Sequence, residues 1–286
     1  MKTVLLDILR PRLKPPGQAW LDKALRAAQP PVNPEALLLA YSGASRWAGK
    51  LALALTPEET RRAAQVAPES PLSHWGADEA ARSAILLSLP AEPPAERDRL
   101  ALLCFEKGDS REQEGWLRGV ALLPGAERFL ATVIDACRTN ILPVFQAVAC
   151  ENPYPARCFP ELNFNQMVLK SLFNGTALER IAGLERRLNP ELSRMADDYA
   201  AEREAAGRQV PVDLWLVQAP HSQGEALARA LRYLEHEEAG HRFWCARGLA
   251  LRRGGAPAEL VARCLKAEPN ARVRQALEAL RPGGAA

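Results

Sequence analysis

The chain has 286 residues, of which 48% are hydrophobic and 25% charged, as in an ordinary folded protein. Its formal net charge of +3 is far from the strongly basic footprint of nucleic-acid-binding proteins, so we expect no nucleic-acid partner. The length exceeds that of a usual single core, and we therefore expect two lobes or one elongated repeat domain.

The cysteines and the N-terminus indicate a cytoplasmic location. The six cysteines include no C-x-x-C pair, and most lie among apolar helical neighbours, so we expect reduced thiols. The segment MKTVLLDILRPRL is not a secretory signal, because Asp7 interrupts a short apolar run and no small-residue cleavage site follows. No stretch approaches the ~20 apolar residues that span a bilayer. The protein is therefore expected to be cytoplasmic and at most peripheral to the inner membrane.

The composition favours an all-α fold. Sustained strand alternation is absent and β-branched residues are sparse, while Ala, Leu, Arg and Glu dominate. Thr56 is the expected N-cap of one helix, with Pro57 in its first turn and Glu59 completing a capping box. Residues 1–72 are predicted to form an N-terminal helical cap, with helices over residues 4–10, 18–28, 33–41, 46–55 and 57–64.

Paired helices follow in a central region, residues 73–215, and in a C-terminal region, residues 216–286. The similar starts of successive pairs are about 30 residues apart, which is typical of HEAT-like solenoids. We therefore predict an α-solenoid stack of antiparallel helix pairs, with a compact helical bundle as the alternative. The predicted helices cover residues 78–89, 93–105, 109–122, 125–137, 139–150, 222–236, 241–253, 257–266 and 270–280.

Residues 151–211 are the densest run of amides, charges and aromatic residues in the chain. Pro153, Pro155 and Pro160 are predicted to exclude a regular helix before residue 161, because each removes an amide donor. The following helix, residues 161–175, places Asn165 in the middle of its apolar arc. A buried amide needs a fixed partner, so we expect Asn165 to be bound either by backbone or by a ligand.

The same segment resembles a known family. The runs NPYPARCFPELNFNQMVLKSLFNG, RIAGLERRLNPELSRM and DDYAAEREAAGRQVP are similar to the signature of the EboA family, described as metabolite traffic proteins. The likeness extends more loosely upstream through YSGASRWAGK at residues 41–50. It implies association with a gene cluster that includes a UbiA-like membrane prenyltransferase, and a role in moving a cytoplasmic precursor toward the membrane. It supplies no reaction.

A ligand pocket is predicted in the middle of the stack, where the concave face of a solenoid would be lined by the amide-rich helices. Two of its ring residues, Tyr154 and Phe159, lie in the proline-rich loop, where rings have no periodic reason to be buried, and its polar residues would give a few specific contacts. The alternative is that the aromatic residues are core. The predicted ligand-binding residues are Tyr154, Phe159, Asn163, Asn165, Gln166, Lys170, Arg180, Arg194, Tyr199 and Arg203.

Asp197, Asp198 and Glu202 support a competing interpretation as an enzyme. Their spacing on a helix that begins with Asn189 as N-cap is similar to acidic motifs of all-α prenyl-diphosphate enzymes, which hold Mg²⁺ through carboxylate oxygens. The same residues together with Arg194 also fit an ordinary surface charge ladder. The apolar stripe of this helix is predicted to bury Leu192, Met195, Tyr199 and Ala206.

The spacing of His236 and His241 is similar to that of a zinc-binding motif but does not match it. They are five residues apart rather than four, which puts them on different helix faces, and Gly240 is predicted to end the helix between them. We therefore expect no metal site and no cofactor, with Mg²⁺ required only if the protein is an enzyme.

The leading hypothesis is a protein that binds a small-molecule or prenylated intermediate, or its partner enzyme, and aids its delivery toward the membrane. The expected partners are that metabolite, a membrane prenyltransferase and other products of the same cluster. Two alternatives stay open: an all-α enzyme acting with Mg²⁺ on a prenyl diphosphate or a cyclitol-like substrate, and a pure protein-protein scaffold.

Overall fold

The computed structural model describes residues 1–69 and 72–280 of the chain. Within these ranges the protein is all-helical, with 18 α-helices, eight short 3-10 helices and no β-strand beyond an isolated bridge between Ala52 and Gly76. The predicted all-α class is confirmed. The ends of the predicted N-terminal and C-terminal regions, at residues 70–71 and 281–286, lie outside the described residues.

The chain divides into two compact units. The first comprises Met1–Pro160 and Arg180–Ala182, and the second comprises Glu161–Glu179 and Gly183–Ala286. The division into regions 1–72, 73–215 and 216–286 stays a prediction.

The first unit contains helices α1 to α11. Most of its predicted helices are found with shifts of a few residues at their ends, and the capping box of Thr56 and Glu59 is confirmed at the start of α5. The helices are α1 (Lys2–Leu9), α2 (Pro15–Ala27), α3 (Pro34–Ser42), α4 (Ala44–Trp47), α5 (Pro57–Val66), α6 (Ala77–Leu86), α7 (Pro94–Glu106), α8 (Ser110–Gly119), α9 (Leu130–Ala136), α10 (Leu142–Ala149) and α11 (Tyr154–Cys158).

Two predictions for this unit are wrong. The helix expected over residues 46–55 ends at Trp47, since Gly49 follows with a φ of 80° and the backbone of Leu53 then bonds to Trp75. The proline-rich loop contains the short helix α11, although no helix was expected before residue 161. Pro155 is accepted there because it lies in the first turn, where an amide donor has no partner within the helix.

Helix α6 is the centre of the first unit, and all of its residues are buried. It contacts α1, α2, α4 and α8. Gly119 of α8 permits a close approach, because a Cβ atom at this position would lie 2.3 Å from the Oγ of Ser83 on α6. Polar residues of α6 are therefore enclosed by neighbouring helices instead of facing water.

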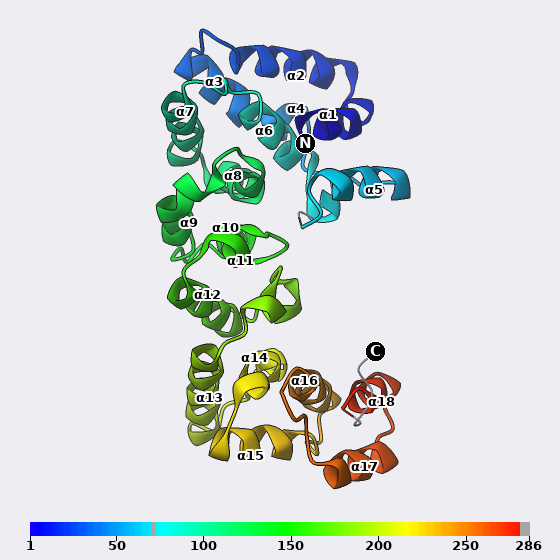
Figure 1. Cartoon of the computed structure of the whole chain (residues 1–286). Coiled ribbons are helices and arrows are strands. Elements are labelled where there is room, and N and C mark those ends of the chain that lie inside the picture. Colours follow the sequence, from blue (N-terminus) through cyan, green and yellow to red (C-terminus); the bar gives the residue numbers. More distant parts are fainter. Residues whose placement is uncertain (70–71, 281–286) are drawn as a thin grey trace. The chain divides into compact units, whose positions relative to one another are not determined.

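The second unit contains helices α12 to α18. The helices predicted over residues 222–236, 241–253, 257–266 and 270–280 are found as α15 to α18, and α16 packs against α14, α15 and α18 (Figure 1). The bounds are α12 (Glu161–Phe173), α13 (Pro190–Ala205), α14 (Trp215–Gln218), α15 (Gly224–Tyr233), α16 (Ala239–Ala250), α17 (Ala258–Ala267) and α18 (Ala271–Glu278).

Helix α13 begins as predicted, with the side chain of Asn189 accepting a hydrogen bond from the backbone of Leu192. Leu192 and Tyr199 are buried, but Met195 is only half-buried. Ala206 is exposed, so its predicted burial is wrong. The helix ends at Ala205, which removes Ala206 from the helical stripe.

Candidate functional site

An apolar groove of about 830 Å³ lies between α2, α3 and α4 in the first unit. Trp20, Leu39 and Trp47 are its large apolar residues, and alanines from α2 and α3 contribute the rest of its apolar lining. Leu39 is 75% exposed and Trp47 is 41% exposed. Large apolar side chains that gather around a hollow in this way are characteristic of ligand-binding surfaces.

Gly43, at the junction of α3 and α4, allows this groove to form. A Cβ atom at Gly43 would lie 2.8 Å from the indole nitrogen of Trp20. The guanidinium of Arg46 lies over the ring of Trp47, 5.1 Å from its centroid. The groove therefore combines two indole rings with at least one cation at its edge.

The α4 wall of the groove is anchored to a buried carboxylate. Ser45 donates a hydrogen bond from Oγ to Oδ2 of Asp78, at 2.8 Å, and accepts one from Nη2 of Arg82, at 3.1 Å. Asp78 and Arg82 both lie on α6 and are 0% and 1% exposed. Arg46 and Trp47, which follow Ser45 directly, are therefore held by a contact that reaches the core.

Asp78 and Glu79 begin a network of buried ion pairs between α6 and α8. Asp78 is bound by both Arg82 and Arg111, and Glu79 by both Arg111 and Arg118. Burial alone would raise the pKa of Asp78, but the hydrogen bonds from Arg111 and Ser45 hold it below its ordinary value. Both carboxylates are thus paired with arginines, and the network stabilises the packing of α6 against α8.

The network continues to Glu151 and Arg180. Glu151 has a positive φ of 49° and accepts two hydrogen bonds from the Arg180 side chain, at 2.7 and 3.0 Å. The backbone N–H of Glu151 also donates to the carbonyl of Arg180, at 2.7 Å. Arg180, a predicted ligand-binding residue, is engaged in holding this unusual backbone conformation.

The two loop rings predicted to bind ligand belong to the core of the first unit. Tyr154 is 1% exposed and donates a hydrogen bond from its hydroxyl to the carbonyl of Ala126, at 2.8 Å. Phe159 is 4% exposed and packs edge-on against Tyr154, with ring centroids 6.3 Å apart. Tyr154 begins α11 and Phe159 follows its last residue, so the two rings meet from opposite ends of this short helix.

Asn165 of α12 has the fixed partner that its burial requires. Its amide exchanges two hydrogen bonds with that of Asn189, at 3.0 and 3.2 Å, and Asn189 also caps α13. The partner is therefore another side chain, and neither the backbone nor the ligand that was expected. Among the other predicted residues of α12, Asn163 and Lys170 are half-buried and Gln166 is exposed.

The predicted residues of α13 lie in several different contacts. Arg194 pairs with Glu191 and Asp198 on its own helix, as a surface charge ladder does. Tyr199 is 8% exposed and packs against Phe173, with ring centroids 4.5 Å apart, while Arg203 lies 5.9 Å from its ring centroid.

The acidic residues of the enzyme hypothesis are not brought together. Asp197 binds Arg229 and Gln218, whereas Asp198 and Glu202 are exposed, with Asp198 held by Arg194. Within residues 1–69 and 72–280, no group of three or more His, Cys, Asp or Glu side chains is placed to hold a metal ion.

The two histidines near the C-terminus meet, contrary to the prediction of separate faces. Gly240 lies in the first turn of α16 and does not end a helix, so His236 precedes α16 and folds onto it. The ring centroids of His236 and His241 are 4.4 Å apart. The Nδ1 of His241 accepts a hydrogen bond from the indole of Trp215, at 2.8 Å, and burial together with His236 lowers the pKa of His241 to about 4.

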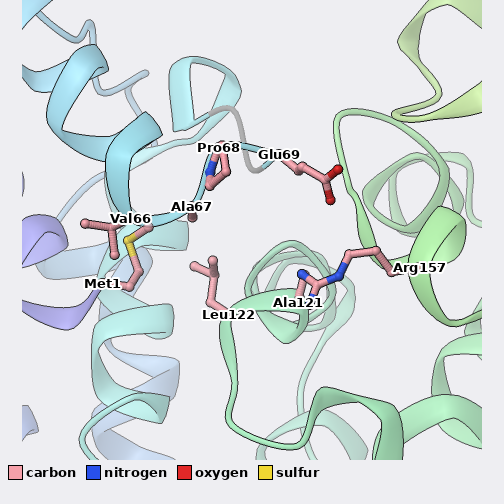
Figure 2. Close-up of a pocket in the computed structure, with 8 residues that line it drawn as sticks. All are labelled: Met1, Val66, Ala67, Pro68, Glu69, Ala121, Leu122 and Arg157. Atoms are coloured by element: carbon pink, nitrogen blue, oxygen red, sulfur yellow. The ribbon is translucent and has the colours of Figure 1, made fainter.

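Two smaller cavities are also present. One, of about 340 Å³, lies in the first unit, with Met1 and Val66 toward one side and the charged ends of Glu69 and Arg157 toward the other (Figure 2). The other, of about 410 Å³, lies between the turn after α15 and α17, where Arg242 and Arg263 are paired with Glu268 and Glu235. Neither cavity nor the groove is lined by a residue predicted to bind ligand.

Sequence reasoning missed the groove, although part of its lining lies in the YSGASRWAGK stretch. Ser42, Gly43, Arg46 and Trp47 all come from that stretch. The signal in the sequence is Arg46-Trp47 shortly after Ser42-Gly43, together with a second tryptophan at residue 20.

Comparison with known proteins places this region in a family. A family model described as "Metabolite traffic protein EboA" matches residues 1–219, which include all groove and network residues. Comparisons with curated proteins and with solved structures yield no match. In the described part of the chain, no helix is both long enough and apolar enough to cross a bilayer.

Proposed function

Because the chain belongs to the EboA family of metabolite traffic proteins, we propose that it binds a largely apolar biosynthetic intermediate in the groove between α2, α3 and α4. Bound there, the intermediate is kept out of water until it is handed on. The groove is the single observation that carries this proposal.

The size and lining of the groove support a small-molecule ligand. Its volume of about 830 Å³ lies within the range of roughly 300 to 1,000 Å³ that is usual for ligand pockets. Covering an exposed side chain such as Leu39 contributes about 2 kcal/mol of apolar burial. Two indole rings add flat surfaces that accept unsaturated or aromatic groups.

A prenylated intermediate is the proposed ligand class, because its branched apolar chain suits a groove of alanine, leucine and tryptophan. Delivery toward the membrane, with a membrane prenyltransferase and other products of the same cluster as partners, extends the family's role in metabolite traffic. On this proposal the protein works at the cytoplasmic face of the inner membrane and needs no cofactor. A HEAT-like stacking of the helix pairs is the proposed architecture.

Equilibrium dialysis with labelled farnesol tests the proposal. Leu39→Asp places a charge in the groove and is expected to weaken farnesol binding at least about tenfold, a loss of ~1.4 kcal/mol. Leu162→Asp is the matched control, because Leu162 is also an exposed helical leucine, at 59%, and lies outside the groove. Equal effects of the two variants, or no binding by the unmodified protein, would overturn the proposal.

A double variant, Asp198→Ala with Glu202→Ala, separates this function from the alternative of a magnesium enzyme. A metabolite carrier keeps its farnesol affinity in this variant, because both residues lie outside the groove. Loss of a Mg²⁺-dependent turnover of prenyl diphosphate in the same variant would favour the enzyme. A pure scaffold would bind no farnesol before or after the change.

A further inference from the structure

The charges around the groove have one sign. In the described part of the chain, the charged residues that line it are Lys23 of α2 and Arg46 of α4, with no carboxylate among them. Both cations are exposed. Lys23 follows Trp20 by three residues and precedes Ala27 by four, so it shares the face of α2 that lines the groove.

Most arginines of the chain have an acidic partner, whereas Lys23 and Arg46 have none among residues 1–69 and 72–280. Arg10, Arg12 and Arg111, among many others, form ion pairs with carboxylates. Within the described residues, neither Lys23 nor Arg46 has a carboxylate within ion-pair distance, and the guanidinium of Arg46 lies over the ring of Trp47. Positive charge therefore remains uncompensated beside an apolar surface.

We infer that the groove selects an amphiphile, with an apolar body packed against the indoles and an anionic end group, such as a phosphate ester, bound by Lys23 and Arg46. This inference rests on the proposed function and adds the chemistry of the ligand's polar end. An uncompensated cation beside an apolar wall binds an anion more strongly than a cation in open water, because the wall excludes part of the solvent. A neutral ligand of the same shape gains nothing from these two residues.

The test compares two probes that share one apolar body, farnesol and farnesyl monophosphate, by equilibrium dialysis at low ionic strength. The phosphate is expected to bind about tenfold or more tightly than the alcohol, in line with charge-assisted hydrogen bonds. Raising the salt concentration to 0.5 M is expected to remove most of this difference, since both cations are exposed.

Variants test whether Lys23 and Arg46 cause the preference for farnesyl monophosphate. The double variant Lys23→Gln with Arg46→Gln should bind both probes with the affinity that the unmodified protein shows for farnesol. The control, Lys107→Gln with Lys266→Gln, removes the same charge from exposed positions outside the groove and should leave the tenfold preference intact. Circular dichroism of each variant verifies that it is folded.

The outcomes distinguish the inference about the anionic end group from the proposed function. Binding of farnesol with no preference for the phosphate overturns the inference and leaves the proposed function standing. A preference that survives in the Lys23 and Arg46 variant also overturns it. Failure of both probes to bind overturns the proposed function itself.

A phosphate ester on an apolar chain occurs in soluble intermediates and in phospholipids, so a third arm distinguishes these sources. Vesicles of phosphatidylglycerol and of phosphatidylcholine are pelleted with the protein. A soluble ligand predicts that sedimentation with phosphatidylglycerol is the same for the unmodified protein and the Lys23 and Arg46 variant. Loss of sedimentation in that variant would assign the two cations to a lipid headgroup and overturn the assignment to a soluble intermediate.

Discussion

Asp78 and Arg111 form a bidentate ion pair at the centre of the first unit, with nitrogen-to-oxygen distances of 2.8 and 2.9 Å. The carboxylate comes from α6 and is fully buried, and the guanidinium comes from α8. Because Arg82 and Ser45 bind the same carboxylate, a single side chain joins α4, α6 and α8.

Asp78→Ala is expected to lower the free energy of unfolding by about 3 to 5 kcal/mol, since it leaves the buried guanidinium of Arg82 without its counter-charge. Urea denaturation measures the loss. Glu58→Ala is the control, because the pair of Glu58 with Arg61 is exposed and contributes about 0 to 1 kcal/mol. Similar losses in the two variants would show that the buried network does not hold the helices together.

Gly119→Ala is expected to destabilise the protein by about 1 to 3 kcal/mol, because its Cβ atom would lie 2.3 Å from Ser83 Oγ. The Oγ of Ser83 is buried and has no hydrogen-bond partner among the described residues, so Ser83→Ala alone should change stability little. The double variant should recover part of the loss. A double-mutant cycle by urea denaturation checks this, and strict additivity would rule out the steric explanation.

His241 is expected to make stability fall as the pH drops from about 6.5 to about 4. Burial first, and His236 second, lower its folded-state pKa to about 4, whereas the unfolded value is ~6.5. The unfolded chain therefore binds more protons in this window. The stabilisation is complete above pH 6.5 and is lost as the pH falls toward the folded pKa, by up to about 3 kcal/mol.

The contacts of the His241 ring explain why protonation of this residue destabilises the folded protein. Trp215 donates to Nδ1 of His241, so a proton on that nitrogen would break the bond, and the nearest carboxylate oxygen, of Glu238, lies 3.9 Å from Nε2. Urea denaturation at pH 7 and pH 5 should give a smaller difference for His241→Gln than for the unmodified protein. His74→Gln, at an exposed position, should keep the full difference. An unchanged pH dependence in His241→Gln would contradict this assignment.

Asn165→Ala is expected to cost about 1 to 3 kcal/mol, because it leaves a buried face of Asn189 without its amide partner. Gln166→Ala, at the adjacent exposed position, should change stability by less than about 0.5 kcal/mol. Thermal or urea denaturation of the two variants gives the comparison. Equal stability of both would show that the amide pair contributes nothing.

Local signals predicted much of the helical structure. Thr56 and Asn189 act as the predicted caps because an N-cap is decided by a few neighbouring residues. Asn165 was correctly predicted to be buried with a partner, because its place in the apolar arc of α12 follows from sequence spacing alone.

The groove and the ion network could not be read from local patterns. Asp78 and Arg82 are four residues apart, which in sequence looks like an exposed helical ion pair, and their burial depends on helices that arrive from elsewhere in the chain. Lys23 and Arg46 look like ordinary solvated charges until α2 and α4 are seen to share one hollow. Tyr154 differs from its prediction in the opposite direction. It was expected to bind a ligand from a loop, but its hydroxyl donates a hydrogen bond to the carbonyl of Ala126 in the core.

The hydrogen bond from Ser45 to Asp78 connects the α4 side of the groove to the buried ion pairs between α6 and α8. Binding of the proposed ligand against Trp47 is therefore expected to increase the resistance of the protein to denaturant, because a ligand that binds only the folded state stabilises it. Conversely, substitutions of buried α6 residues such as Asp78 are expected to weaken binding of the proposed ligand, although α6 does not line the groove.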